Sequence, residues 1–207
     1  MWHDEIALLG ADLVQWFRRL ADTSDRWHPA YFELGFGLAR SDDLDPHSQS
    51  APVTILDGIR LRGSVDLIER AAAGSTLRVT DHKTGANRSH RGLIVGGGEV
   101  LQPVLYGLAV EQALQARVGS TRLFYCTERA GFAEHELPLD DRARAAGREV
   151  LAIIDRAIAT GFLPAAPRQD ACARCDFHLV CGPHEAERLG RKDAEPLADL
   201  IALRQQP

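Results

Sequence analysis

Two strand patterns joined by a short turn constrain the fold of this chain more than any other feature. Residues 58–68 and 76–81 have the composition of strands, and the small residues 71–75 between them are typical of a turn. The two segments should therefore pair as a hairpin. This pairing places Asp66 and Asp81 on adjacent strands, near the end of each strand.

The second strand ends in the charged motif Asp81-His82-Lys83. Because strand side chains alternate between two faces, Asp81 and Lys83 should share a face and His82 should point away. Two carboxylates beside an ammonium group can hold a cation such as Mg²⁺, which keeps several waters and needs only one or two protein carboxylates. The lysine can orient a metal-bound water or offset charge on a phosphate, so the motif suits phosphodiester hydrolysis.

A simpler interpretation of the motif remains open. Asp81 to Gly85 could form a polar turn at the end of a strand, since Asp and Gly are common turn residues. Asp66 favours a metal site, because a charge within an apolar strand is costly to bury without a partner. We therefore predict that Asp66, Asp81 and the backbone carbonyl of His82 bind one divalent metal ion.

Three further polar residues are weaker candidates. Gln102 and Tyr106 lie four residues apart on a helix expected at about 99–117, so they share a face, although such a pair can serve packing or hydrogen bonding alone. Glu33 lies on a strand expected at 31–38, where a lone glutamate is usually just solvated.

The rest of the pattern predicts helices around a central sheet. We expect helices at 6–20 and 140–160, a strand pair at 121–127 and 133–137, and a mobile glycine-rich loop at 88–98. This order of elements predicts an α/β or α+β fold, with a central sheet flanked by helices.

Length and charge limit the functional classes. A chain of 207 residues with 45% hydrophobic content fits a single domain over 1–207, and residues 165–207 form a cysteine-containing segment with a tail helix. The net charge of -5 argues against a broad basic DNA-binding surface, so local patches or a partner must hold DNA. The start lacks the features of a signal peptide, and no apolar run approaches the roughly 20 residues that span a bilayer, so we expect a cytoplasmic protein without membrane association.

Four segments carry a family resemblance through their order and spacing. They are Gly63-Ser64-Val65-Asp66, Val79-Thr80-Asp81-His82-Lys83-Thr84-Gly85, Leu101-Gln102-Pro103-Val104-Leu105-Tyr106, and Cys172-Ala173-Arg174-Cys175 followed by Cys181. Together they resemble the PD-(D/E)XK nuclease superfamily, and more narrowly its RecB-like branch, which includes the AddB subunit of helicase-nucleases. The resemblance extends from about Glu33 to the region of Arg191 and is much more specific than any one segment.

The resemblance implies a restriction-endonuclease-like core with a mixed sheet. It implies catalytic roles for Asp66, Asp81 and Lys83, with Gln102 and Tyr106 beside the metal, where they help to hold the scissile phosphate and its water. It also implies an accessory metal or water contact for Glu33, the acidic residue near a position that is acidic in the family.

The activity implied by the resemblance is that of a Mg²⁺- or Mn²⁺-dependent deoxyribonuclease, an exonuclease rather than an endonuclease. Its partners would be DNA and a helicase subunit or domain, in the repair and recombination of double-strand breaks. The alternative is a nuclease-fold module without activity that has a structural or DNA-clasping role. The acidic net charge favours this alternative, whereas the intact set of site residues favours the enzyme.

Cys172, Cys175 and Cys181 are close enough in sequence to bind one zinc ion or iron–sulfur cluster, and either requires a fourth ligand. In the resembled AddB-type nucleases, a [4Fe–4S] cluster takes three cysteines from this segment and one from far upstream of the nuclease motifs.

This chain departs from that pattern, because no cysteine precedes Cys126 and Cys126 itself fits a small buried residue in a strand. We therefore expect a chain that is incomplete at its N-terminus and that holds no stable cluster by itself. His178 or His184 could instead supply the fourth ligand, which would favour zinc.

Overall fold

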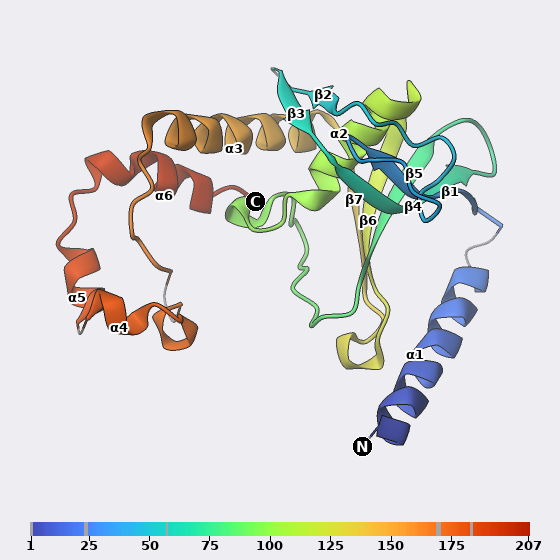
Figure 1. Cartoon of the computed structure of the whole chain (residues 1–207), viewed down its shortest axis with the longest axis horizontal. Coiled ribbons are helices and arrows are strands. Elements are labelled where there is room, and N and C mark those ends of the chain that lie inside the picture. Colours follow the sequence, from blue (N-terminus) through green and yellow to red (C-terminus); the bar gives the residue numbers. More distant parts are fainter. Residues whose placement is uncertain (1, 23–24, 57, 169–170, 183) are drawn as a thin grey trace.

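The computed structural model describes residues 2–22, 25–56, 58–168, 171–182 and 184–207. Its centre is a five-stranded sheet in the order β1-β4-β5-β6-β7 (Figure 1). β5 and β6 run parallel, whereas the other neighbours are antiparallel, so the sheet is mixed as predicted. The strands are β1 (Trp27–Phe36), β4 (Gly63–Ala71), β5 (Leu77–Lys83), β6 (Val118–Tyr125) and β7 (Glu134–Pro138).

The predicted hairpin is confirmed, since β4 and β5 pair as antiparallel strands with Leu67 opposite Thr80. The first strand pattern, however, divides into two strands. β3 (Ile59–Leu61) pairs with β2 (Val53–Ile55) in a separate two-stranded sheet, and β4 starts at Gly63. The composition of residues 58–68 predicts strand structure. It does not predict that the residues before and after Arg62 pair with different strands, because that depends on which strands lie nearby.

α2 (Gln102–Leu114) connects β5 to β6 and packs on one face of the sheet. Its buried side chains, with those of the strands, form the main hydrophobic core. α3 (Asp141–Thr160) packs against α2, and a side chain at Gly147 would approach Val104 to 2.8 Å, so this close helix contact requires glycine. The Asp140 carboxylate caps α3 by accepting from the Ala143 N–H at 2.9 Å.

α1 (Trp2–Asp22) is the amphipathic helix expected near residues 6–20, but it lies apart from the main core (Figure 1). None of its described residues is buried. It contacts the rest of the chain where Asp12 accepts from the Glu128 N–H at 2.8 Å and where the Trp16 ring meets the His82 ring at 5.1 Å. None of the helices in the described parts of the chain has the length and apolar character to cross a membrane.

The C-terminal part contains α4 (His178–Cys181), α5 (Glu185–Gly190) and α6 (Ala198–Arg204). Its last residues reach the glycine-rich loop, where the backbone N–H groups of Ile94 and Gly96 donate to the Pro207 oxygen at 3.1 and 3.0 Å. Val95 in this loop is fully buried. The second half of the loop expected at 88–98 is therefore packed, through buried apolar side chains and hydrogen bonds to Pro207, and its expected mobility stays a prediction.

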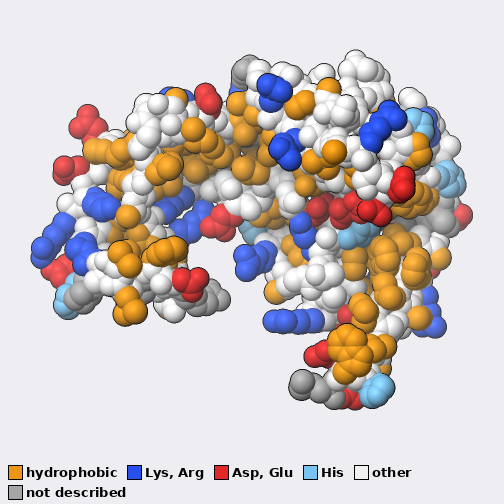
Figure 2. Space-filling model, viewed as in Figure 1, with side chains coloured by type: hydrophobic (Ala, Val, Ile, Leu, Met, Phe, Trp, Pro, Cys, Tyr) orange, Lys and Arg blue, Asp and Glu red, His pale blue; other side chains and the backbone are white. Residues whose placement is uncertain are grey.

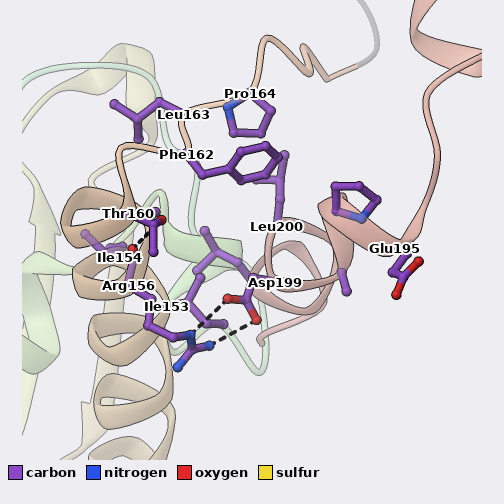
Figure 3. A pocket seen from close by; sticks show the side chains of 14 residues that line it. Ile153, Ile154, Arg156, Thr160, Phe162, Leu163, Pro164, Glu195, Asp199 and Leu200 are labelled. Atoms are coloured by element: carbon purple, nitrogen blue, oxygen red, sulfur yellow. Dashed lines mark hydrogen bonds and ion pairs between the residues drawn. The ribbon is translucent and has the colours of Figure 1, made fainter.

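α3 and α6 also enclose an apolar cavity of about 530 Å³ (Figure 3). Arg156 on α3 donates two hydrogen bonds of 3.0 Å to the Asp199 carboxylate on α6 at its edge. This cavity shares no residue with the candidate site described below.

Candidate active site

Four of the predicted residues form a continuous chain of contacts at the end of β5. The Lys83 Nζ lies 2.5 Å from the Asp81 Oδ2 and donates to the Gln102 Oε1, also at 2.5 Å. The Gln102 Nε2 in turn donates to the Tyr106 hydroxyl at 3.3 Å. Asp81 and Lys83 therefore share one face, as predicted from strand alternation.

The topology explains why α2 supplies the second half of this group. Because β5 and β6 are parallel, the chain must cross over from the end of β5 to the start of β6, and α2 lies in this connection. α2 begins at Gln102, beside the edge of the sheet where β5 ends. Pro103 follows at the first turn of α2, where a missing N–H costs no helical hydrogen bond. The first helical turn thus presents Gln102 to Lys83, and Tyr106 follows one turn later on the same side.

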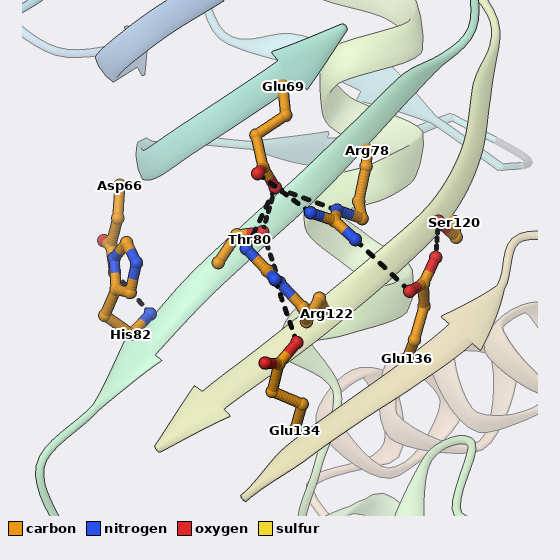
Figure 4. A network of polar contacts seen from close by, with 9 residues as sticks. All are labelled: Asp66, Glu69, Arg78, Thr80, His82, Ser120, Arg122, Glu134 and Glu136. Carbon is orange, nitrogen blue, oxygen red and sulfur yellow. Dashed lines mark hydrogen bonds and ion pairs between the residues drawn. The ribbon is translucent and has the colours of Figure 1, made fainter. Parts of the chain in front are cut away.

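Asp66 lies beside this group but faces His82 (Figure 4). Its Oδ2 accepts from the His82 backbone N–H at 2.8 Å and lies 3.6 Å from the His82 Nδ1. The His82 ring points away from Lys83, as predicted, and packs between Trp16 and Phe124. The structure therefore places Asp66 within electrostatic range of Asp81 and Lys83, without a direct contact to Lys83.

The two aspartates have opposite electrostatic environments. Burial raises the pKa of Asp81, and the nearby Asp66 charge adds to this, so the attraction of Lys83 does not restore the usual pKa. Burial also raises the pKa of Asp66, but the nearby His82 ring and the hydrogen bond from the His82 backbone N–H outweigh burial and lower it overall. The charged form of Asp81 is thus less favoured than that of Asp66, although Lys83 pairs with Asp81 at 2.5 Å.

This imbalance fits a divalent cation. The Asp81 Oδ2 is buried, and its contact with the Lys83 ammonium is a close ion pair without the geometry of a hydrogen bond. The residues that the structure describes contain no group of three or more His, Cys, Asp or Glu arranged for a metal. Mg²⁺ does not need such a group, because waters and a substrate phosphate complete its coordination. Both carboxylates are ligands of the type that this ion prefers, but Asp66 faces His82 and Asp81 faces Lys83, so their convergence on one ion stays a prediction.

Glu33 lies close to Asp66 in an unusual backbone conformation. Its φ angle is 50°, a value that is rare for a residue other than glycine within a strand. Its Oε2 accepts from the Ser64 hydroxyl at 2.9 Å, and both Glu33 and Asp66 line the same cavity. Strained residues tend to cluster at functional sites, so the geometry is consistent with an accessory role, which stays a prediction.

A buried ionic network on β4, β5 and β6 escaped the sequence analysis (Figure 4). Glu69 accepts two hydrogen bonds of 2.9 Å from Arg78, one of 2.7 Å from Thr80 and one of 3.1 Å from Arg122. The side chains of Glu69, Arg78 and Arg122 are each at most 4% exposed. The sequence did contain a signal for this network. Arg78, Thr80 and His82 alternate with apolar or acidic residues along β5, which indicates that the face of the sheet opposite Val79 and Asp81 is polar.

The three C-terminal cysteines lie within electrostatic range of one another. The pKa of the Cys172 thiol is raised by partial burial and by the charges of Glu185, Cys175 and Cys181. In the described ranges these thiols form no metal-binding group, and the side chain of His178 lies outside the described residues. Cys126 is half-buried, its Sγ donates to the Phe124 carbonyl at 3.3 Å, and burial raises its pKa to about 11.

Two cavities meet the candidate site from different sides. One, of about 500 Å³, is lined by Lys83, Gln102 and Tyr106, with Arg88 at its wall. The other, of about 790 Å³, lies between α1 and the sheet and includes Asp66 and His82. Lys83, Gln102 and Tyr106 therefore line one cavity, and Asp66 lines the other.

Asp81 and Lys83 lie at the end of β5, whereas Asp66 lies in the first half of β4 and not near its end, where the sequence pattern predicted it. A mixed sheet with these groups and a polar helix start beside them is the arrangement expected of a metal-dependent phosphodiester-cleaving protein. The comparison with protein families agrees with this class: the chain matches the PD-(D/E)XK nuclease superfamily over residues 2–182 and belongs to it. Nucleases of this superfamily generally use divalent metals, and its restriction-endonuclease-like core agrees with the fold described above.

No curated protein matches the sequence. Among solved structures, the crystal structure of SSO0001 is similar at 16% sequence identity and a TM-score of 0.38, covering 81% of this chain and 67% of that one. A likeness at this level supports no conclusion about the site.

Proposed function

We propose that this chain is a divalent-metal-dependent deoxyribonuclease of the RecB-like, AddB-related branch. The observation that carries the proposal is the contact chain from Asp81 through Lys83 and Gln102 to Tyr106, with Asp66 beside it. It supports hydrolysis because carboxylates can hold a metal ion and an ammonium group can offset charge on the phosphate during phosphodiester cleavage.

Asp66 and Asp81 would hold Mg²⁺ or Mn²⁺, together with the His82 carbonyl. When bound, the metal would supply Lewis-acid stabilisation of the phosphate and a more acidic water. Lys83 would offset negative charge that develops on the phosphate oxygens. Gln102 fixes the Lys83 ammonium through its amide oxygen and so keeps this charge at the site, while Tyr106 orients the Gln102 amide.

The shape of the surface supports DNA as substrate despite the net charge of -5. Figure 2 shows a hollow between the part of the molecule that contains α4, α5 and α6 and the part that contains the sheet and α1. Lys and Arg side chains lie on both sides of this hollow. Such local positive charge can attract a phosphate backbone where the whole protein does not. We infer that DNA lies in this hollow and that a helicase subunit or domain delivers it during the repair of double-strand breaks.

Cleavage of end-labelled linear DNA in Mg²⁺, in Mn²⁺ and in a chelator tests the activity, and covalently closed circular DNA separates exonuclease from endonuclease action. We expect cleavage of linear DNA with metal and none with Asp81→Asn. Asp42→Asn, an exposed carboxylate on the loop before β2, is the matched control and should cleave like the wild type. Binding of DNA without cleavage by the wild type, under every metal condition, would favour the inactive, DNA-clasping alternative.

The cysteine segment calls for a separate test. We propose that Cys172, Cys175 and Cys181 supply three ligands of a [4Fe–4S] cluster or a zinc ion and that this chain lacks the fourth cluster ligand. Anaerobic purification with iron, sulfide and zinc analysis should find less than a full cluster. About four irons per chain would contradict this expectation.

A further inference from the structure

We propose that Arg168 is a positioning residue of the candidate active site: it holds the glycine-rich loop in front of α2 and so fixes where Gln102 meets Lys83. This inference rests on the proposed nuclease function and adds to it a residue from a distant part of the chain. The Arg168 Nη2 donates to the Gly97 carbonyl at 3.2 Å, and its Nη1 lies 2.7 Å from the Glu99 Oε1. Because Glu99 precedes Gln102 by three residues, Arg168 holds the chain directly before α2 begins.

The loop at 94–98 has few means of fixing its own conformation. Gly96, Gly97 and Gly98 follow one another with φ angles of 54°, 62° and 87°, and glycine loses more conformational freedom on ordering than any other residue. The N-cap residue of α2, Leu101, makes no side-chain hydrogen bond to the helix start. Buried side chains anchor α2 itself, so the loop and the residues that join it to α2 are the parts that need contacts from elsewhere in the chain.

The C-terminal part of the chain supplies these contacts, and its last residues lie beside the loop that leads into α2 (Figure 1). The three N–H groups at 94–96 donate to the Pro207 oxygen at 2.6 to 3.1 Å. The Gly97 N–H donates to the Gln206 carbonyl at 2.9 Å. These last residues accept from the loop, whereas Arg168 donates to a loop carbonyl. The loop is therefore held through its donors and its acceptors alike.

The loop also reaches the candidate site directly. Gly98 and Glu99 line the same cavity of about 500 Å³ as Lys83 and Gln102. The Lys83 Nζ and the Gln102 Oε1 are 2.5 Å apart, so a small displacement of the start of α2 would lengthen this hydrogen bond. A misplacement of about 1 Å caused by a remote change can lower a rate roughly 10²-fold. Loss of the loop contacts of Arg168 should therefore lower kcat rather than weaken the binding of substrate.

A direct contact with DNA is the competing role for Arg168, because its side chain is 40% exposed. In this structure its guanidinium is engaged by Gly97 and Glu99. A contact with a DNA phosphate would raise KM and the salt dependence of binding when the arginine is removed. A positioning role would lower kcat and kcat/KM equally, at constant KM. The two roles therefore predict different kinetics.

Steady-state cleavage of end-labelled linear DNA in Mg²⁺ tests the proposal. Arg168→Ala should lower kcat roughly tenfold at constant KM, because the start of α2 loses its fixed position. In the Gln102→Ala background the same change should have no further effect, since both variants lose one and the same contact. Arg168→Lys should recover part of the rate, because its ammonium can still pair with Glu99 but lacks the second arm of the guanidinium. Arg191→Ala, which removes an arginine that is 74% exposed and paired with Glu187, is the matched control and should cleave like the wild type.

Two glycines of the loop test the same contact without removing a charge. A Cβ at Gly97 would approach the Arg168 Nη2 to 2.7 Å and the Arg204 carbonyl oxygen to 3.0 Å, so Gly97→Ala should displace the loop and lower kcat. Gly92→Ala is the matched control, because Gly92 also has a positive φ, 86° against 62° for Gly97. Beyond its chain neighbours, no described atom lies within 4 Å of a Cβ at Gly92. Gly92→Ala thus introduces backbone strain without the clash and should keep the wild-type kcat.

A second readout needs no cleavage and follows the Gln102 side chain itself. Its side-chain amide resonance in an NMR spectrum, assigned from its loss in Gln102→Ala, should shift in Arg168→Ala and in Gly97→Ala. It should stay unchanged in Gly92→Ala.

Three results would overturn the proposal. A raised KM with unchanged kcat in Arg168→Ala would assign Arg168 to DNA, and an unshifted Gln102 amide would show that the loop does not position this side chain. If the wild type cleaves DNA but the effects of Arg168→Ala and Gln102→Ala simply add, only this inference fails. If the wild type cleaves no DNA while the Gln102 amide shifts as expected, the link from Arg168 to Gln102 stands and only the proposed hydrolysis fails.

Discussion

The two faces of β5 carry charged residues that are held in very different ways. On one face, Arg78 and Thr80 are joined to Glu69 in a network with hydrogen bonds of 2.7 to 2.9 Å. On the other face, Asp81 meets only a close lysine contact, and its pKa is raised by burial. The first arrangement satisfies its charges with fully buried partners, whereas the second pairs a buried carboxylate with a partly exposed lysine. The charge at the end of β5 is therefore the one that solvent and a substrate can reach.

The largest effect should come from Lys83→Ala. Removal of the ammonium should lower the rate of DNA cleavage by roughly 10²- to 10⁴-fold, because the charge beside the reacting phosphate is lost. The thermal midpoint should stay nearly unchanged, since the side chain is partly exposed at 31%. Lys192→Ala, which removes the other lysine of the chain, is the control and should retain cleavage. A Lys83→Ala variant that fails to fold would make the lysine structural and break the contrast between the two faces.

Glu69→Gln should have the largest effect on stability. It leaves Arg78 and Arg122 buried without their carboxylate, which costs about 3–5 kcal/mol of unfolding free energy. Glu134→Gln is the matched control, because the Glu134 side chain is 37% exposed and its pair with Arg122 should contribute at most about 1 kcal/mol. Urea unfolding followed by circular dichroism measures both. Equal losses in the two variants would mean that burial does not decide the strength of this network.

Added Mg²⁺ should stabilise the wild type and not Asp81→Asn. A ligand that binds only the folded state at 100 times its Kd contributes about 2.7 kcal/mol, which corresponds to roughly 5–10 °C in a domain of this size. In a chelator, Asp81→Asn should be no less stable than the wild type, because burial raises the pKa of Asp81 and disfavours its charged form in the metal-free fold. Thermal melting with and without Mg²⁺ checks both statements. A metal-independent loss of stability in Asp81→Asn would place Asp81 with the structural charges.

The smallest effect is the pH dependence of the network. Burial alone would raise the pKa of Glu69, but Arg78 and Arg122 lower it below its ordinary value of 4.5. A carboxylate with a lowered pKa stabilises the fold above its unfolded pKa and loses this contribution as the pH falls through the folded value. The stability difference between the wild type and Glu69→Gln should therefore be constant near neutral pH and shrink below about pH 4.5. A difference that grows in acid would contradict the assignment of Glu69 as the ionised centre of the network.

Strand alternation and helix periodicity determined much of this protein from the sequence alone. They predicted the β4–β5 hairpin, the shared face of Asp81 and Lys83, and the outward direction of His82. These features depend on neighbours one or two residues away, whose directions the backbone geometry fixes. The mixed sheet with its flanking helices followed from the same patterns, together with the resemblance to the superfamily.

Only the tertiary structure decided which groups meet across the sheet. Asp66 turns to His82, Glu69 finds two arginines on neighbouring strands, and the glycine-rich loop receives the chain end. The contact of Gln102 with Lys83 likewise depends on where the crossover from β5 to β6 starts α2. Strand register and crossover position set these distances, and both depend on the packing of segments that lie far apart in the sequence.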